Sequence, residues 1–245
     1  MNRTSITGLA CLLAVALTAC AGGGEPPAPS GSPASAPLEA LKEPANSMSV
    51  SPPLSPAPVS AEALADYRAL LAGEPGALDR PPEGLELHQV TLPPAEELEY
   101  VLLDLDGDGG AELVVQMVAQ PHQFNAVFHY GDGELSCWQY DIMEMSCRDY
   151  PLGDGAMVRQ YDTGTGPNRY SNLYTVFRYL PDGETEECAS LAVHQDTQED
   201  GTEVFTYLVD DAEVDQDTFA AEFEELVGSR LLSLEDWTPA TERPG

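Results

Sequence analysis

Short apolar runs separated by polar turns fill most of the chain between residues 99 and 209, and their lengths are typical of β-strands. Asp-Gly dipeptides, which favour the tight turns of hairpins, occur six times, and four of them stand between such runs. Strands are therefore expected at residues 99–104, 112–118, 126–130, 135–140, 157–161, 173–180, 189–194 and 204–209. A series of hairpins in this order predicts an antiparallel β-meander.

A helix is predicted before the strands. Ser60 is a suitable N-cap, because its hydroxyl can accept a hydrogen bond from a free N–H group of the first turn. Leu64, Tyr67 and Leu71 then recur at helical spacing, and Gly73 is a typical stop.

A second helix is predicted after residue 214, with Asp215 or Asp217 as its cap. Its apolar positions are Phe219, Phe223, Leu226 and Val227. The expected fold class is therefore α+β: an antiparallel meander with an N-terminal and a C-terminal helix. We expect one domain over residues 59–240, followed by a tail at 241–245.

The N-terminus has the pattern of an export signal. Arg3 precedes an almost wholly apolar run over residues 6–17, which is too short to span a bilayer but suits the core of a signal peptide. The run ends in Leu17-Thr18-Ala19-Cys20, which resembles the lipobox of bacterial lipoproteins, whose cysteine is acylated and becomes the mature N-terminus. We therefore expect a signal peptide at residues 1–19 and a lipid anchor on Cys20, on the extracytoplasmic face of the cell membrane. The alternative is an ordinary cleaved signal peptide.

Composition separates the next segment from the domain. Residues 20–58 hold ten of the 21 prolines, with Ser, Ala and Gly between them, so a disordered tether is expected. The whole chain carries 42 acidic residues against 10 Lys and Arg, a formal net charge of −32. Such a polyanion lacks the basic side chains that contact phosphates, which excludes nucleic acid as a partner.

The most specific chemical motif is the segment 104–112, in which acidic side chains alternate with Leu and Gly. Asp104, Asp106, Asp108 and Glu112 offer carboxylate oxygens, and Gly110 can offer its carbonyl. Ca²⁺ prefers six to eight oxygen ligands, and alternate residues of a tight loop present oxygens on one side. Strand-like residues on both sides predict a β–loop–β calcium site with a structural role. The alternative is a hairpin that binds nothing.

This motif resembles the calcium loops of FG-GAP repeats, with Glu112 in place of the last Asp, although a single copy does not support a propeller fold. Together with the lipobox, the tether and Trp237, it resembles uncharacterised membrane lipoproteins of Clostridia-type Gram-positive bacteria. In motif the loop also resembles EF-hand-like calcium loops, although Val115 stands where an EF-hand places its last glutamate. The resemblance implies a surface location and a calcium loop, and no known activity.

Cysteines beyond the lipobox allow a disulfide in an exported protein. Cys137 and Cys147 lie symmetrically about Ile142, so a hairpin turning there would place them opposite each other. The alternative is a set of buried thiols that includes Cys188. Cysteine and histidine spacings do not suggest zinc.

No sequence motif of a catalytic site accompanies the four histidines or the serines. We therefore expect a calcium-stabilised binding or interaction domain rather than an enzyme, with a glycan, a peptide or an envelope protein as partner. The alternatives are an extracellular hydrolase acting on cell-wall or host polymers, and a structural component of the envelope.

Overall fold

The computed structural model describes residues 57–140, 147–166, 168–242 and 244. One compact unit takes in all of them. The predicted signal peptide, Cys20 and most of the tether lie outside the described residues, as does Ile142. Among the described helices, none is both long enough and apolar enough to cross a membrane.

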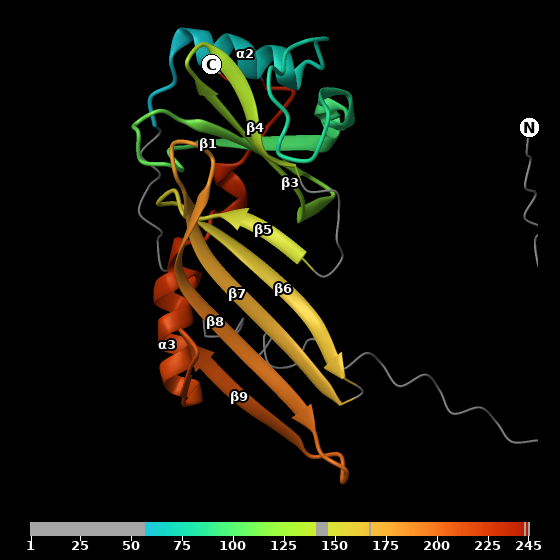
Figure 1. The fold of residues 1–245 in the computed structure, drawn as a ribbon, viewed down its shortest axis with the longest axis vertical. Coiled ribbons are helices and arrows are strands. Elements are labelled where there is room, and N and C mark those ends of the chain that lie inside the picture. Colours follow the sequence, from blue (N-terminus) through green and yellow to red (C-terminus); the bar gives the residue numbers. More distant parts are fainter. Residues whose placement is uncertain (1–56, 141–146, 167, 243, 245) are drawn as a thin grey trace, which may run out of the picture. The chain divides into compact units, whose positions relative to one another are not determined.

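The first sheet has five antiparallel strands in the order β11-β1-β2-β3-β4. Their bounds are Leu98–Leu103 for β1, Glu112–Met117 for β2, Gln120–Gly131 for β3, Glu134–Tyr140 for β4 and Thr238–Pro239 for β11. The helix α2, Ala61–Leu71, lies over one face of this sheet (Figure 1). Its N-cap is Ser60, whose hydroxyl accepts the N–H of Ala63, as the sequence predicts.

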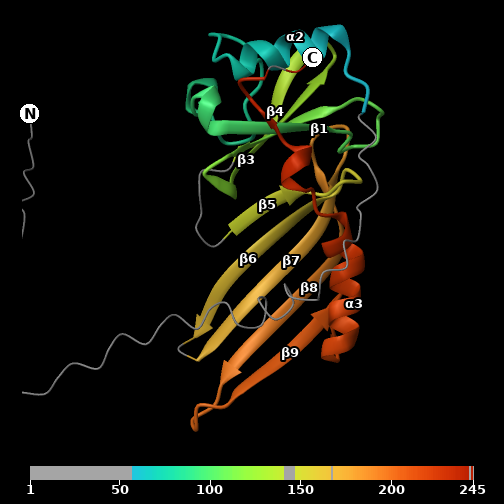
Figure 2. The same ribbon diagram turned by 180° about the vertical axis from the view of Figure 1, so that it is seen from behind.

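The second sheet has six antiparallel strands in the order β10-β9-β8-β7-β6-β5. Their bounds are Cys147–Pro151 for β5, Met157–Gly166 for β6, Arg169–Tyr179 for β7, Thr185–Thr197 for β8, Glu203–Val209 for β9 and Ala212–Val214 for β10. The helix α3, Gln216–Leu226, is capped by Asp215 and packs against β8 and β9, where Phe219 contacts the ring of Tyr207. Figure 2 shows from behind that each helix covers a different sheet.

Four short 3-10 helices complete the secondary structure of the described residues: η1 at Leu87–Gln89, η2 at Ala95–Glu97, η3 at Gly228–Arg230 and η4 at Leu234–Asp236. Two antiparallel sheets with two helices make the fold α+β, as predicted. The predicted continuous meander is only partly right: strands β1 to β10 follow in sequence order but divide into two sheets between β4 and β5, and β11 returns to pair with β1. The sequence pattern missed β5, whose residues Cys-Arg-Asp-Tyr-Pro lack an apolar alternation, and it missed the short edge strands β10 and β11.

Both faces of the first sheet are buried. One face packs on α2 through a cluster that includes Tyr67, Leu113 and Phe128. The opposite face packs on Met157, Phe177 and Tyr179 of the second sheet and on Trp237: its residues are Val101, Leu103, Val114 and Val127. A strand covered on both faces needs apolar residues at successive positions, and this explains why β2 reads Leu-Val-Val rather than alternating.

A buried polar network joins the two sheets. The side chain of Asp149 in β5 is fully buried, and its carboxylate accepts two hydrogen bonds from Arg159 of β6, the shorter 2.6 Å long. The same carboxylate accepts a hydrogen bond of 2.7 Å from Gln139 of β4, whose amide oxygen accepts the hydroxyl proton of Tyr179 at 2.6 Å. Because a buried carboxylate destabilises the fold unless it is paired, these bonds fix how β4 lies against β5 to β7.

Candidate metal centre

The loop between β1 and β2 carries the acidic motif. Antiparallel pairing of Leu103 with Glu112 brings the two ends of the loop together. Leu105 is fully buried between the sheets and holds the loop against the core. Gly109 has a φ of 88°, a left-handed conformation that side chains disfavour and that permits the sharp turn of the loop.

Aspartate carboxylates fold back on the loop and accept its backbone N–H groups. Asp104 accepts the N–H of Gly107 at 2.7 Å and that of Gly109 at 3.1 Å. Asp106 accepts the N–H of Asp108 at 3.0 Å. Carboxylate oxygens of Asp104, Asp106 and Asp108 lie within 4.8 Å of one another. The loop therefore gathers three carboxylates around a small volume.

Glu112 lies apart from this group at the beginning of β2, where it is 1% exposed. Its Oε2 accepts the N–H of Leu105 at 2.7 Å, and its Oε1 lies 3.0 Å from Nδ1 of His129. Burial raises the pKa of the Glu112 carboxyl, and the hydrogen bonds from His129 and Leu105 oppose that rise. The glutamate is thus a buried acid held in one position by two donors.

His129 comes from β3, whose pairing with β2 sets Phe128 opposite Leu113 and so brings His129 beside Glu112. Its ring stacks on Trp138 with centroids 4.2 Å apart and planes 12° from parallel. Burial lowers the pKa of His129, but the hydrogen bond and charge of Glu112 outweigh that effect and raise it overall. Sequence reasoning missed this residue. A hairpin turn predicted near residue 120 would have placed residues 112 and 129 opposite each other on neighbouring strands.

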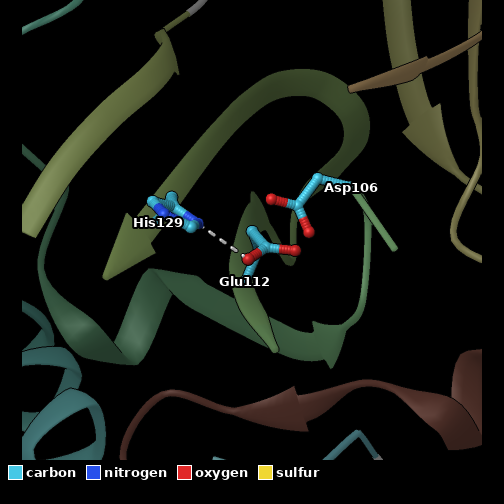
Figure 3. A group of neighbouring side chains, drawn as sticks. All are labelled: Asp106, Glu112 and His129. Carbon is cyan, nitrogen blue, oxygen red and sulfur yellow. Dashed lines mark hydrogen bonds and ion pairs between the residues drawn. The ribbon is translucent and has the colours of Figure 1, made fainter. Parts of the chain in front are cut away.

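Asp106 belongs to both groups. Its carboxylate lies beside Glu112 and His129 (Figure 3), and ligand atoms of these three residues lie within 4.8 Å of one another. Burial raises the pKa of Asp106. Its Oδ2 is buried and has no hydrogen-bond partner among the described residues. The acidic residues of this region could thus hold a metal ion, in one or both of two groups that share Asp106.

The predicted ligand set is therefore divided by the structure. Asp104, Asp106 and Asp108 come together as a loop group, whereas Glu112 meets only Asp106 of that group. Gly110 takes part through its N–H, which donates to Asp108 Oδ1 at 2.5 Å.

The turn predicted about Ile142, which would place Cys137 opposite Cys147, lies outside the described residues. Cys137 lies in β4 of the first sheet and Cys147 in β5 of the second, and β4 pairs with β3 whereas β5 pairs with β6. The structure contains no disulfide bond between them. Cys137 is buried, which raises the pKa of its thiol to about 12.

One serine and histidine pair lies in the second sheet. Oγ of Ser171 is 2.7 Å from Nδ1 of His194, across the pairing of β7 with β8. Ser171 is 1% exposed, and no carboxylate among the described residues is bonded to His194. A buried serine without an oriented base gives a substrate no accessible nucleophile.

Comparisons of the sequence with protein-family models, with curated proteins and with solved structures return no match. The chemistry of the metal centre therefore rests on its own geometry.

Proposed function

We propose that the chain is a membrane-anchored extracytoplasmic lipoprotein whose α+β domain is an interaction module stabilised by Ca²⁺ at the 104–112 loop. The gathering of Asp104, Asp106 and Asp108 within 4.8 Å carries the calcium part of this proposal. Carboxylates at that separation repel one another at neutral pH unless a cation lies between them. The cation stabilises the hairpin and, through Leu105, the core between the sheets.

Calcium suits this loop better than magnesium. Ca²⁺ accepts irregular sets of oxygen ligands at about 2.3–2.6 Å, whereas Mg²⁺ demands a near-octahedral set at shorter distances. The loop group offers carboxylates from alternate residues, and backbone N–H groups already hold both oxygens of Asp104 and one oxygen each of Asp106 and Asp108. Solvent can supply further oxygens because Asp108 is exposed.

The interaction part of the proposal is supported by a hollow of about 1000 Å³ beside the end of α2. Leu70, Leu71, Leu87, Val90 and Leu92 contribute apolar surface to it. Such a lining suits a peptide, a hydrophobic face of a glycan or a segment of an envelope protein. The rival functions are a hydrolase, for which Ser171 is too deeply buried to act, and a structural envelope component that needs no ligand.

Thermal unfolding of the full chain with and without Ca²⁺ tests the calcium proposal. For a dissociation constant of about 10⁻⁴–10⁻³ M, as in extracellular modules, 10 mM Ca²⁺ stabilises by roughly 1.4–2.7 kcal/mol. A domain of this size gains about 2–4 °C per kcal/mol, so the midpoint is expected to rise by roughly 3–11 °C.

Asp104→Asn keeps an acceptor for one of the two loop N–H groups but removes the charge, and it should abolish most of the rise. Asp200→Asn, in a hairpin turn of the second sheet, is the matched control and should keep the rise in full. An unchanged midpoint of the wild type at 10 mM Ca²⁺, together with no heat of binding in calorimetry, would refute the calcium site.

The anchor is tested separately with Cys20→Ser. Without the acylated thiol the protein should leave the membrane fraction or stay unprocessed, because acyl chains supply the membrane affinity. Retention in the membrane fraction at the wild-type level would contradict the lipoprotein assignment and leave the calcium proposal untouched.

A further inference from the structure

The strongest group outside the predicted calcium loop is the one that sequence reasoning did not assemble: Asp106, Glu112 and His129. Three different parts of the fold supply it: the β1–β2 loop, the beginning of β2, and β3. We propose that these three side chains form a second metal site, selective for a divalent transition-metal ion such as Zn²⁺ over Ca²⁺. This assignment moves Glu112 out of the calcium set. It shares Asp106 with the loop group, but it requires neither Asp104 nor Asp108.

A buried oxygen atom without a hydrogen-bond partner indicates a ligand at this group of side chains. Oδ2 of Asp106 is buried and lacks a hydrogen-bond partner among the described residues. A carboxylate oxygen that is removed from water without a hydrogen-bond partner destabilises the fold, and more so when the group is charged. Glu112, whose carboxylate lies in the same group, is itself 1% exposed, so repulsion between the two carboxylates adds to the cost of desolvation. A cation between them removes both penalties at once.

The imidazole decides the class of cation. Ca²⁺ and Mg²⁺ take oxygen ligands, whereas nitrogen of a neutral imidazole suits Zn²⁺ and its neighbours among the transition metals. One histidine with two carboxylates is a ligand set that leaves a fourth position of Zn²⁺ to water. The net charge of the two carboxylates also matches a divalent ion.

Distances in the group are close to those of a metal-bound set. Glu112 Oε1 and His129 Nδ1 are 3.0 Å apart. Zn²⁺ binds nitrogen and oxygen at about 2.0–2.2 Å, so two ligands at a tetrahedral angle lie roughly 3.3–3.5 Å apart. The pair therefore has to open by only a few tenths of an ångström, and the ion takes the place of the proton between the two atoms.

Neighbouring groups hold the ligands in place before an ion arrives. The ring of His129 is stacked on Trp138, and Oε2 of Glu112 is held by the N–H of Leu105. Such supporting contacts raise affinity, since their removal from metal sites typically weakens binding about 10–100-fold. The third ligand, Asp106, is carried by the loop between β1 and β2.

Calorimetric titration of the untagged full chain with Zn²⁺, in the presence of 10 mM Ca²⁺, tests this proposal. The wild type should bind one Zn²⁺ saturably. His129→Ala should bind it at least about 100-fold more weakly, because a direct ligand contributes no less than the supporting contacts do. The matched control is His88→Ala, which removes the exposed partner of Glu86 and should bind Zn²⁺ like the wild type.

Asp104→Asn separates the two metal proposals: it should lose the Ca²⁺ response and keep Zn²⁺ binding. If His129→Ala does not fold, the ring signals of the four histidines in the NMR spectrum of the wild type give the answer without that variant. Zn²⁺ should shift the His129 signal, assigned by replacing the other three histidines one at a time. Absence of saturable Zn²⁺ binding, wild-type affinity in a folded His129→Ala, or a shift confined to another histidine would each overturn the proposal.

Discussion

Gly155, in the turn between β5 and β6, touches the first residue of the acidic loop, and its replacement by alanine tests that contact. Its φ is 83°, and a Cβ added there would overlap the backbone carbonyl oxygen of Asp104 far inside contact distance. Because that oxygen belongs to the backbone, rotation of a side chain cannot relieve the overlap. Gly155→Ala must therefore displace either the turn or the beginning of the loop.

The magnitude follows from a comparison with Gly201, in the turn between β8 and β9. Its φ is 84°, but a Cβ there would meet nothing within 4 Å. Alanine in the left-handed region costs roughly 1–2 kcal/mol at either position. Overpacking adds about 1–3 kcal/mol at Gly155 alone, so we expect a loss of roughly 2–5 kcal/mol for Gly155→Ala and roughly 1–2 kcal/mol for Gly201→Ala.

Urea unfolding followed by tryptophan fluorescence measures both variants, with Trp138 and Trp237 as probes at the core between the sheets. Addition of 10 mM Ca²⁺ to the same samples should raise the free energy of unfolding less for Gly155→Ala than for Gly201→Ala, because only Gly155→Ala strains the contact with Asp104. Equal destabilisation of the two variants would refute the close contact between the turn and the loop.

Three further changes test other parts of the structure. Arg159→Ala should cost about 3 kcal/mol in urea unfolding, since it strands the buried carboxylate of Asp149; a loss below 1 kcal/mol would contradict the proposed role of the network. Burial raises the pKa of Asp154, but its arginine partners outweigh that effect and hold the pKa below 3.8. The ion pairs of Asp154 therefore contribute to the free energy of unfolding above pH 3.8, and this contribution disappears as the pH falls further. The stability difference between wild type and Asp154→Asn should therefore be present at pH 6 and shrink toward pH 2.5, and a constant difference would contradict the ion pairs. In thiol labelling of the native protein, exposed Cys188 should react at once and buried Cys137 only after unfolding; rapid labelling of Cys137 would show that β4 is more open than described.

Features that depend on neighbouring residues were predictable from the sequence. Ser60 and Asp215 cap the two helices as expected, because a cap needs only its own first turn. The Asp-Gly pairs at 132, 154, 182 and 200 all lie in hairpin turns, since their preference for tight turns is local. The aspartates at 104, 106 and 108 also come together as expected, because a loop of that length leaves them little room to separate.

Features that depend on distant residues needed the tertiary structure. No local sequence signal indicates that the strands divide into two sheets, or that Asp149 and Gln139 meet between them. The same holds for His129, which is 17 residues from Glu112 and reaches it only through the register of β2 with β3. The sequence by itself determined the turns, the caps and the loop aspartates, because short-range sterics and hydrogen bonds decide them. Only the tertiary structure decided that Glu112 is buried, that Asp106 has an unpartnered oxygen and that His129 lies beside both, because strand register and packing bring together residues that are far apart in the sequence.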